Sequence, residues 1–182
     1  MGVCLLWLVL VLSASAETCL AVDDLYVCQL QELAGQGDDE SRFALALLYE
    51  YGEQGVARDP RKALALLLQA GQAGLPGACL YLGIKYENGN GVDRDPVAAV
   101  NWYGCAARKG WAMAQFFLAE LYKKGKGVRQ DNCLALAWFG LAAEQGYPGA
   151  KEALMQLRQE MSADDQGRAV SIRSGLLNLG AQ

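Results

Sequence analysis

A repeat of 36 residues constrains this chain more than any other feature of its sequence. When the chain is shifted by 36 positions, thirteen residues between 78 and 113 meet an identical residue. An earlier, more degenerate copy of the repeat precedes them, with one residue inserted in its loop at 52–55. A fixed period of this length is typical of solenoids, in which each unit buries its apolar face only by stacking on its neighbours. The chain is therefore expected to fold as a row of similar units.

Each copy is predicted to contain two helices. Ala78, Leu82 and Tyr86 follow the spacing of a buried helical stripe. Glycines at 89 and 91 are expected to end this helix, because glycine tolerates the left-handed conformation of a helix C-terminus. Asp95 can then cap a second helix, with proline in its first turn. The predicted fold is all-α, an α-solenoid of antiparallel helix pairs.

The repeated pattern resembles that of a known family. Read from Ala78 to Gly110, it is A-x-x-x-L-G-x-x-Y-x-x-G-x-G-V-x-x-D-x-x-x-A-x-x-W-Y-x-x-A-A-x-x-G. This pattern is similar to the Sel1-like repeat, a relative of the tetratricopeptide repeat. The first copy departs from it, since Ser41 replaces the first alanine and Leu66-Leu67 replaces the Trp-Tyr pair.

The resemblance divides the chain into four parts. Residues 1–16 form an expected signal peptide, and residues 17–40 an N-terminal segment with a capping helix from Val22 to Ala34. Residues 41–147 hold three Sel1-like repeats, at 41–77, 78–113 and 114–147. Residues 148–182 form a C-terminal capping helix pair, whose second helix is expected to begin at a capping box at Ser162 to Asp165.

The first sixteen residues have the character of a secretory signal peptide. They carry no charged side chain, and Leu5 to Leu12 is an unbroken apolar block. Ala14-Ser15-Ala16 supplies a small-residue cleavage pattern, and the block is too short for a permanent membrane helix. We therefore predict an exported protein, periplasmic or secreted from a bacterial envelope, with no permanent membrane anchor.

Export makes disulfides plausible among the remaining five cysteines. Cys79 lies nine residues before the end of its helix at 88, and Cys105 lies nine residues after Pro96, so the antiparallel register places them at one height. We predict a Cys79–Cys105 bond. Cys19 and Cys28 are then predicted to pair locally, and Cys133 to remain free.

Composition excludes several functions. The chain has no histidine, which removes Ser-His-Asp triads, Cys-His dyads and imidazole metal sites. Its 20 acidic and 16 basic residues give a net charge of −4, which argues against a nucleic-acid partner. The glycine loops lack the Lys-Ser/Thr of a phosphate-binding loop. We expect a non-enzymatic protein with no cofactor and no metal.

The resemblance implies an adaptor that holds a protein or peptide on the concave face formed by the first helices. Positions opposite the buried stripe give a candidate surface that is apolar at one end and charged at the other. An alternative is that its large apolar members pack between repeats. The candidate residues are Phe43, Leu47, Tyr51, Leu80, Ile84, Asn88, Phe116, Glu120 and Lys124.

A second resemblance keeps an enzymatic alternative open. Cys79 followed by Leu82-Gly83 is similar to the cysteine-rich Sel1-like proteins of Helicobacter, some of which are linked to penicillin binding or weak β-lactamase activity. This chain departs from that branch, because paired cysteines do not recur in every repeat. It also lacks a serine with a lysine three residues on.

Overall fold

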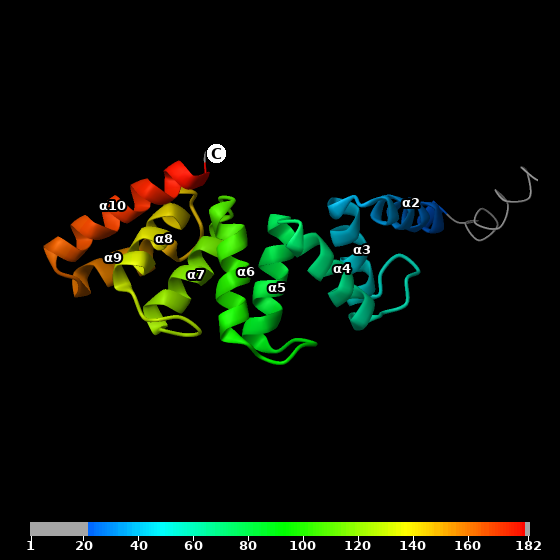
Figure 1. The fold of residues 1–182 in the computed structure, drawn as a ribbon, viewed down its shortest axis with the longest axis horizontal. Helices are drawn as coiled ribbons and strands as arrows, with labels where there is room; N and C mark the ends of the chain where they lie inside the picture. The colour runs from blue at the N-terminus through cyan, green and yellow to red at the C-terminus, as the bar shows by residue number, and fades with distance from the viewer. Residues whose placement is uncertain (1–21, 181–182) are drawn as a thin grey trace, which may run out of the picture. The chain divides into compact units, whose positions relative to one another are not determined.

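The structure is a computed structural model that describes residues 22–180, and within this range the chain forms nine α-helices and no strand. Within the described residues the chain divides into two compact units, unit 1 ending at Leu66 and unit 2 beginning at Leu67, so the division falls inside helix α4 (Pro60–Gln72). No helix of the described range is long and apolar enough to cross a membrane. Figure 1 shows the order of the helices along the chain.

Unit 1 is built on helices α2 (Val22–Gln36) and α3 (Asp39–Tyr51), which pack against each other. Asp38 caps α3, because its carboxylate accepts a hydrogen bond of 2.8 Å from the Ser41 amide. Hydrogen bonds from the Ser41 side chain and from its amide lower the pKa of Asp38 below its ordinary value. The residue inserted in the loop after α3 is accommodated by Gln54, whose φ of 51° is left-handed. The small core contains Val27, Leu30, Ala34, Leu45 and Leu48.

Unit 2 contains the two better-preserved repeats. Helices α5 (Pro76–Asn88) and α6 (Pro96–Arg108) form one pair, and α7 (Ala112–Lys124) and α8 (Asn132–Glu144) form the next. Asp95 and Asp131 cap the two second helices by accepting hydrogen bonds of 2.9–3.1 Å from two amides each. The predicted stripe is confirmed at Ala78 and Leu82, which are buried like their counterparts Ala114 and Leu118, whereas Tyr86 is half-buried.

The loop between α7 and α8 also explains a repeated glycine. Gly127 has a φ of 69°, and a Cβ atom there would lie 2.2 Å from the carbonyl oxygen of Pro96. No larger residue fits without moving one of the two backbones. Glycine at this position therefore lets the loop of the third repeat rest on the first turn of the second helix in the preceding repeat.

The C-terminal residues form helices α9 (Ala150–Glu160) and α10 (Ala163–Gly180). At the predicted capping box, the Ser162 hydroxyl accepts a hydrogen bond from the Asp165 amide and donates one to its carboxylate. Helix α10 does not lie along α9 as α6 lies along α5. It turns back along α8 and reaches α6 near its own end (Figure 1). Both helices thus cover α8.

Candidate interaction surface

The first helices of unit 2 carry the surface that the sequence predicted as a partner-binding face. Burial of the stripe at 78, 82, 114 and 118 turns the opposite sides of α5 and α7 outward. Ile84 and Glu120 are half-buried there, whereas Asn88 and Lys124 are exposed. Glu120 and Lys124 form an ion pair one helical turn apart. The charged end of the face is therefore internally paired.

Tyr103 of α6 fixes the spacing of the two first helices. Its hydroxyl donates a 2.8 Å hydrogen bond to Glu87 on α5, and its ring centroid lies 5.4 Å from that of Phe117 on α7. A Cβ atom at Gly83 would lie 2.5 Å from the Tyr103 ring, so the glycine makes room for it. Burial is the main cause that raises the pKa of Tyr103, followed by the Glu87 carboxylate. The phenol therefore stays neutral and remains a hydrogen-bond donor.

Two predicted surface residues belong partly or wholly to the core. Leu80 is only 5% exposed and packs inside unit 2, so its assignment to the partner-binding face was wrong. It points inward because neighbouring helices cover that flank of α5. Phe116 is half-buried, and its ring lies 5.4 Å from Phe139 and 5.0 Å from Tyr147. Its role is chiefly to pack α7 against its own repeat.

The remaining three predicted residues lie on α3 in unit 1. Phe43 and Leu47 are half-buried, and Tyr51 is 57% exposed at the end of the helix. Their burial leaves Tyr51 as the residue of this group most available to a ligand.

Sequence reasoning missed three residues of the first-helix face. Met113 is 39% exposed, and Tyr81 and Phe117 are half-buried. Met113 lies seven residues before Glu120, on the same side of α7, and that spacing could have identified it. The first-helix face of unit 2 consists of Tyr81, Ile84, Asn88, Met113, Phe117, Glu120 and Lys124.

The structure joins Cys79 of α5 to Cys105 of α6 by a disulfide, with Cα atoms 6.0 Å apart. This is the pair that the helical register places at one height, and it ties the two helices of the second repeat together. Cys133 is a free, buried thiol. Cys19, the other half of the predicted bond to Cys28, lies outside the described residues, as does the predicted signal peptide.

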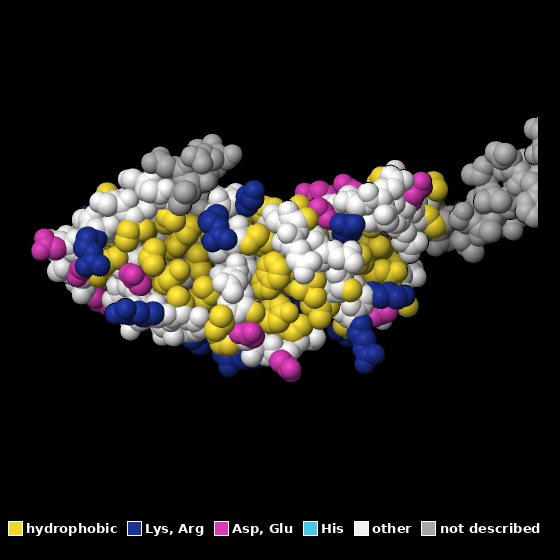
Figure 2. All heavy atoms as spheres, in the orientation of Figure 1, with side chains coloured by type: hydrophobic (Ala, Val, Ile, Leu, Met, Phe, Trp, Pro, Cys, Tyr) yellow, Lys and Arg dark blue, Asp and Glu magenta, His cyan; other side chains and the backbone are white. Residues whose placement is uncertain are grey.

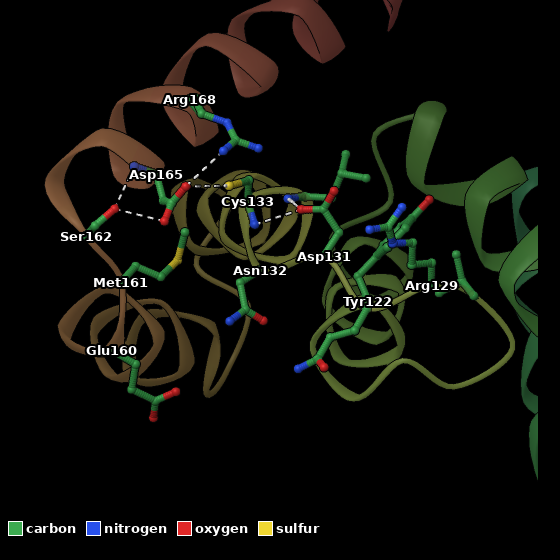
Figure 3. A pocket seen from close by; sticks show the side chains of 13 residues that line it. Tyr122, Arg129, Asp131, Asn132, Cys133, Glu160, Met161, Ser162, Asp165 and Arg168 are labelled. Atoms are coloured by element: carbon green, nitrogen blue, oxygen red, sulfur yellow. Dashed lines mark hydrogen bonds and ion pairs between the residues drawn. The ribbon is translucent and has the colours of Figure 1, made fainter.

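A pocket of about 800 Å³ lies where the loop before α8 faces the turn between α9 and α10 (Figure 3). The Cys133 thiol lies in it, 3.9 Å from the Asp165 carboxylate, which also pairs with Arg168. Burial is the main cause that raises the pKa of Cys133, so the thiol stays protonated and is a poor nucleophile. Among the described residues, no group of three Cys, Asp or Glu side chains could hold a metal ion.

Paired helices of 13 residues with matching caps and loops define a helical-repeat protein of the solenoid class. The Sel1 repeat family model matches residues 39–75, 76–111 and 112–147. These matches cover more than half of the chain, and the protein therefore belongs to the Sel1 repeat family. Each matched range begins two residues before the repeat boundary that the sequence pattern predicted. It coincides with the first residue of α3, α5 or α7.

Solved structures share this fold. A Sel1 repeat protein from Oxalobacter formigenes is 36% identical, with a TM-score of 0.69 over 74% of this chain and 99% of that chain. The protective antigen c5321 of uropathogenic Escherichia coli strains, which has an SLR fold, is 24% identical with a TM-score of 0.63. That match covers 85% of this chain and 41% of c5321, and it shows the fold alone. No curated protein sequence matches the chain.

Proposed function

We propose that the protein is a non-enzymatic adaptor that holds a protein or peptide segment on its first-helix face. The observation that carries this proposal is the exposed methionine Met113, in line with Phe117 and the Glu120–Lys124 pair on α7. Methionine adapts its shape to varied apolar partners, and aromatic side chains supply contact area at low entropic cost. The ion pair can exchange partners with charges on an incoming segment.

The amount of exposed apolar surface also favours a protein partner. In Figure 2, hydrophobic side chains gather over α5 and over the region of α7 to α9. Contiguous apolar patches on a protein surface commonly mark interaction sites. An amphipathic helix or an extended segment with alternating apolar residues would bury such a patch.

The test is partner capture by crosslinking and pull-down from the envelope of the cell that makes the protein. Met113→Arg and Glu120→Arg should each reduce capture severalfold, because one places a charge on the apolar part and the other breaks the ion pair. Exposed substitutions of this kind normally change the free energy of unfolding by about 0.5 kcal/mol or less.

Val170→Arg is the matched control, since Val170 is 57% exposed on α10 and lies outside the first-helix face. It should leave capture unchanged. If both Met113→Arg and Glu120→Arg capture the same partners as the native protein, the interface lies elsewhere. Circular dichroism checks that each variant keeps its helix content.

We also propose that the protein acts outside the cytoplasm. The apolar leader at residues 1–16 and the disulfide between Cys79 and Cys105 support this proposal, because disulfides persist mainly in oxidising compartments. Mass spectrometry of the native protein from an envelope or culture fraction should give a chain beginning at Glu17. Recovery of a chain beginning at Met1 in the cytoplasm would contradict export.

A further inference from the structure

The way α10 lies on α8 shows what the outer face of a second helix can bind. Ala169 of α10 is 2% exposed in the core that includes Leu136 and Trp138 of α8. The Arg173 side chain lies on the surface left open by Gly140, since a Cβ atom there would be 3.1 Å from its Nη1 atom. The same nitrogen forms a 3.1 Å ion pair with Glu144. An apolar contact, a glycine gap and an ion pair together hold the helix.

The repeat places an equivalent face on α6, one unit earlier. A shift of 36 residues relates Leu136 to Val100, Gly140 to Gly104 and Glu144 to Arg108. Cys133 is likewise related to Val97, which is 57% exposed on the first turn of α6. The glycine and the apolar positions are kept, and the charge at the end of the helix is reversed.

This face borders an open groove between α6 and α8. The groove holds a cavity of about 330 Å³ next to Leu176, where the end of α10 reaches α6. Its floor is formed by Leu118 and Tyr122 of α7, and its α8 side by Leu134 and Trp138. The α6 side contributes Val100, Asn101, Gly104 and Arg108. The groove thus offers both apolar and polar surface, with one cationic group at its edge.

Arg108 carries the charge at the edge of this groove. It is exposed, it forms no ion pair with any residue in the range 22–180, and its Nη1 atom would lie 3.2 Å from a Cβ atom at Gly104. On α8 the corresponding carboxylate is paired with an arginine from the bound helix. By charge complementarity, a helix bound to α6 must supply a carboxylate where α10 supplies Arg173.

We propose that the groove between α6 and α8 is a second docking site, which binds an amphipathic helix of a partner protein through apolar side chains and a carboxylate paired with Arg108. This site is on the second helices, so it is separate from the first-helix face. It would allow the adaptor to hold two partners at once, one on each set of helices.

Two synthetic peptides test the proposal on the full chain. Both have the sequence of residues 162–180, the native helix that binds α8, and carry a fluorescent label; one has Arg173→Glu and is the acidic probe, and the other is the native, basic probe. Fluorescence anisotropy should show that the acidic probe binds about fivefold to tenfold more tightly than the basic probe. Added salt should reduce this preference.

The variant Arg108→Glu should reverse the preference, so that the basic probe binds more tightly. Lys151→Glu makes the same charge change at an exposed position of α9 and should leave both affinities unchanged. Val97→Arg should weaken binding of the acidic probe, since it places a charge on the exposed apolar end of the α6 face. Met113→Arg, which tests the first-helix face, should have no effect on the probes.

Several outcomes would overturn the proposal. They are equal affinities for the two probes, no detectable binding of the acidic probe, or affinities that Arg108→Glu leaves unchanged. If Val97→Arg leaves the affinity for the acidic probe unchanged, the probe replaces α10 on α8, and this outcome also overturns the proposal. Because Met113→Arg separates the two faces, failure here leaves the proposed first-helix function intact.

Discussion

The second and third repeats of this chain have helices of the same length, yet their second helices are buried very differently. In α8, all eight residues from Ala135 to Ala142 are buried, whereas in α6 only four of the eight equivalent residues, 99–106, are buried. Helices α9 and α10 cover α8, and no described helix of unit 2 covers the outer side of α6 in the same way. Burial thus depends on the position of a repeat in the row as well as on its own pattern.

The interiors of the two repeats are packed with different residues at corresponding positions. The second repeat pairs Gly83 with Tyr103, whose hydroxyl reaches Glu87. In the third repeat, the corresponding residues are Ala119, Phe139 and Lys123. The ring without a hydroxyl needs no acceptor, and the lysine provides none. The three positions therefore change together between the two repeats, as expected for side chains that contact one another.

The two repeats also differ in how their helices are tied. The disulfide partners Cys79 and Cys105 correspond to Gln115 and Leu141 in the third repeat. Gln115 is buried, donates to the Ala107 carbonyl at 3.2 Å and accepts from Gln145 at 2.8 Å. A hydrogen-bonded amide thus stands where the second repeat has a covalent bond. The second repeat is therefore the one whose stability should respond to redox conditions.

The largest expected effect is that of removing the helices that make α8 different from α6. A chain ending at Gly146 lacks α9 and α10 and exposes the apolar sides of α8 to water. Terminal repeats need a cap for solubility, so this truncation should aggregate or melt far below the native chain. Size-exclusion chromatography and thermal melts followed by circular dichroism measure this.

A chain ending at Gly180 is the matched control and should behave as the native protein. If the chain ending at Gly146 stays monomeric and melts at the native temperature, residues 150–180 are not the cap. The difference between α6 and α8 would then have no consequence for stability.

Loss of the disulfide should have the next largest effect. The bond between Cys79 and Cys105 spans 26 residues, and closing a loop of that size restricts the unfolded chain by about 3–4 kcal/mol. Under oxidising conditions, the Cys79→Ala/Cys105→Ala variant should have a free energy of unfolding lower than that of the native protein by about this amount, as measured by denaturant unfolding. Cys133→Ala is the control that changes a free thiol. An oxidised double variant with the native midpoint would show that the bond adds no stability.

Gly83→Ala tests whether the glycine in the second repeat is required by the ring of Tyr103. The new Cβ atom would lie 2.5 Å from two ring atoms of a buried side chain, and overpacking of this kind costs about 1–3 kcal/mol. Gly175→Ala in α10 is the control, because its Cβ atom would meet nothing within 4 Å. It should be neutral or stabilise the helix. Equal stability of the two variants would contradict this role for Gly83.

The smallest effect concerns the Tyr103 hydroxyl. Tyr103→Phe removes the hydrogen bond to Glu87 and should cost about 0.5–1.5 kcal/mol at neutral pH. The pKa of Tyr103 is raised in the folded protein, so its contribution is complete below the ordinary tyrosine pKa of 10.0 and is lost as pH rises above it. Unfolding midpoints measured from pH 8 to 11 should therefore fall less steeply in the variant. Parallel profiles would mean that Tyr103 ionises equally in both states.

Much of the local structure could be predicted from the residues because it depends on short-range physics. Aspartate caps at 95 and 131, glycine stops at 89 and 125, and the stripe at 78 and 82 depend only on helix geometry. The pairing of Cys79 with Cys105 also follows from the length of two helices joined by one turn. The same periodicity also predicts which sides of the first helices turn away from the buried stripe.

What the sequence by itself determined is the repeat, its helices, their caps and the family to which the chain belongs, because each depends on contacts within about 36 residues. Only the tertiary structure decided that Leu80 is buried, that α10 turns back along α8, and that α6 keeps an open groove with Arg108 at its edge. Those features depend on which helix covers which, over distances that a repeating pattern does not encode. The same repeat position is exposed without an ion pair among the described residues at Arg108 and paired with Arg173 at Glu144. The reason is that α10 places an arginine beside Glu144 but leucines, Leu176 and Leu177, beside Arg108.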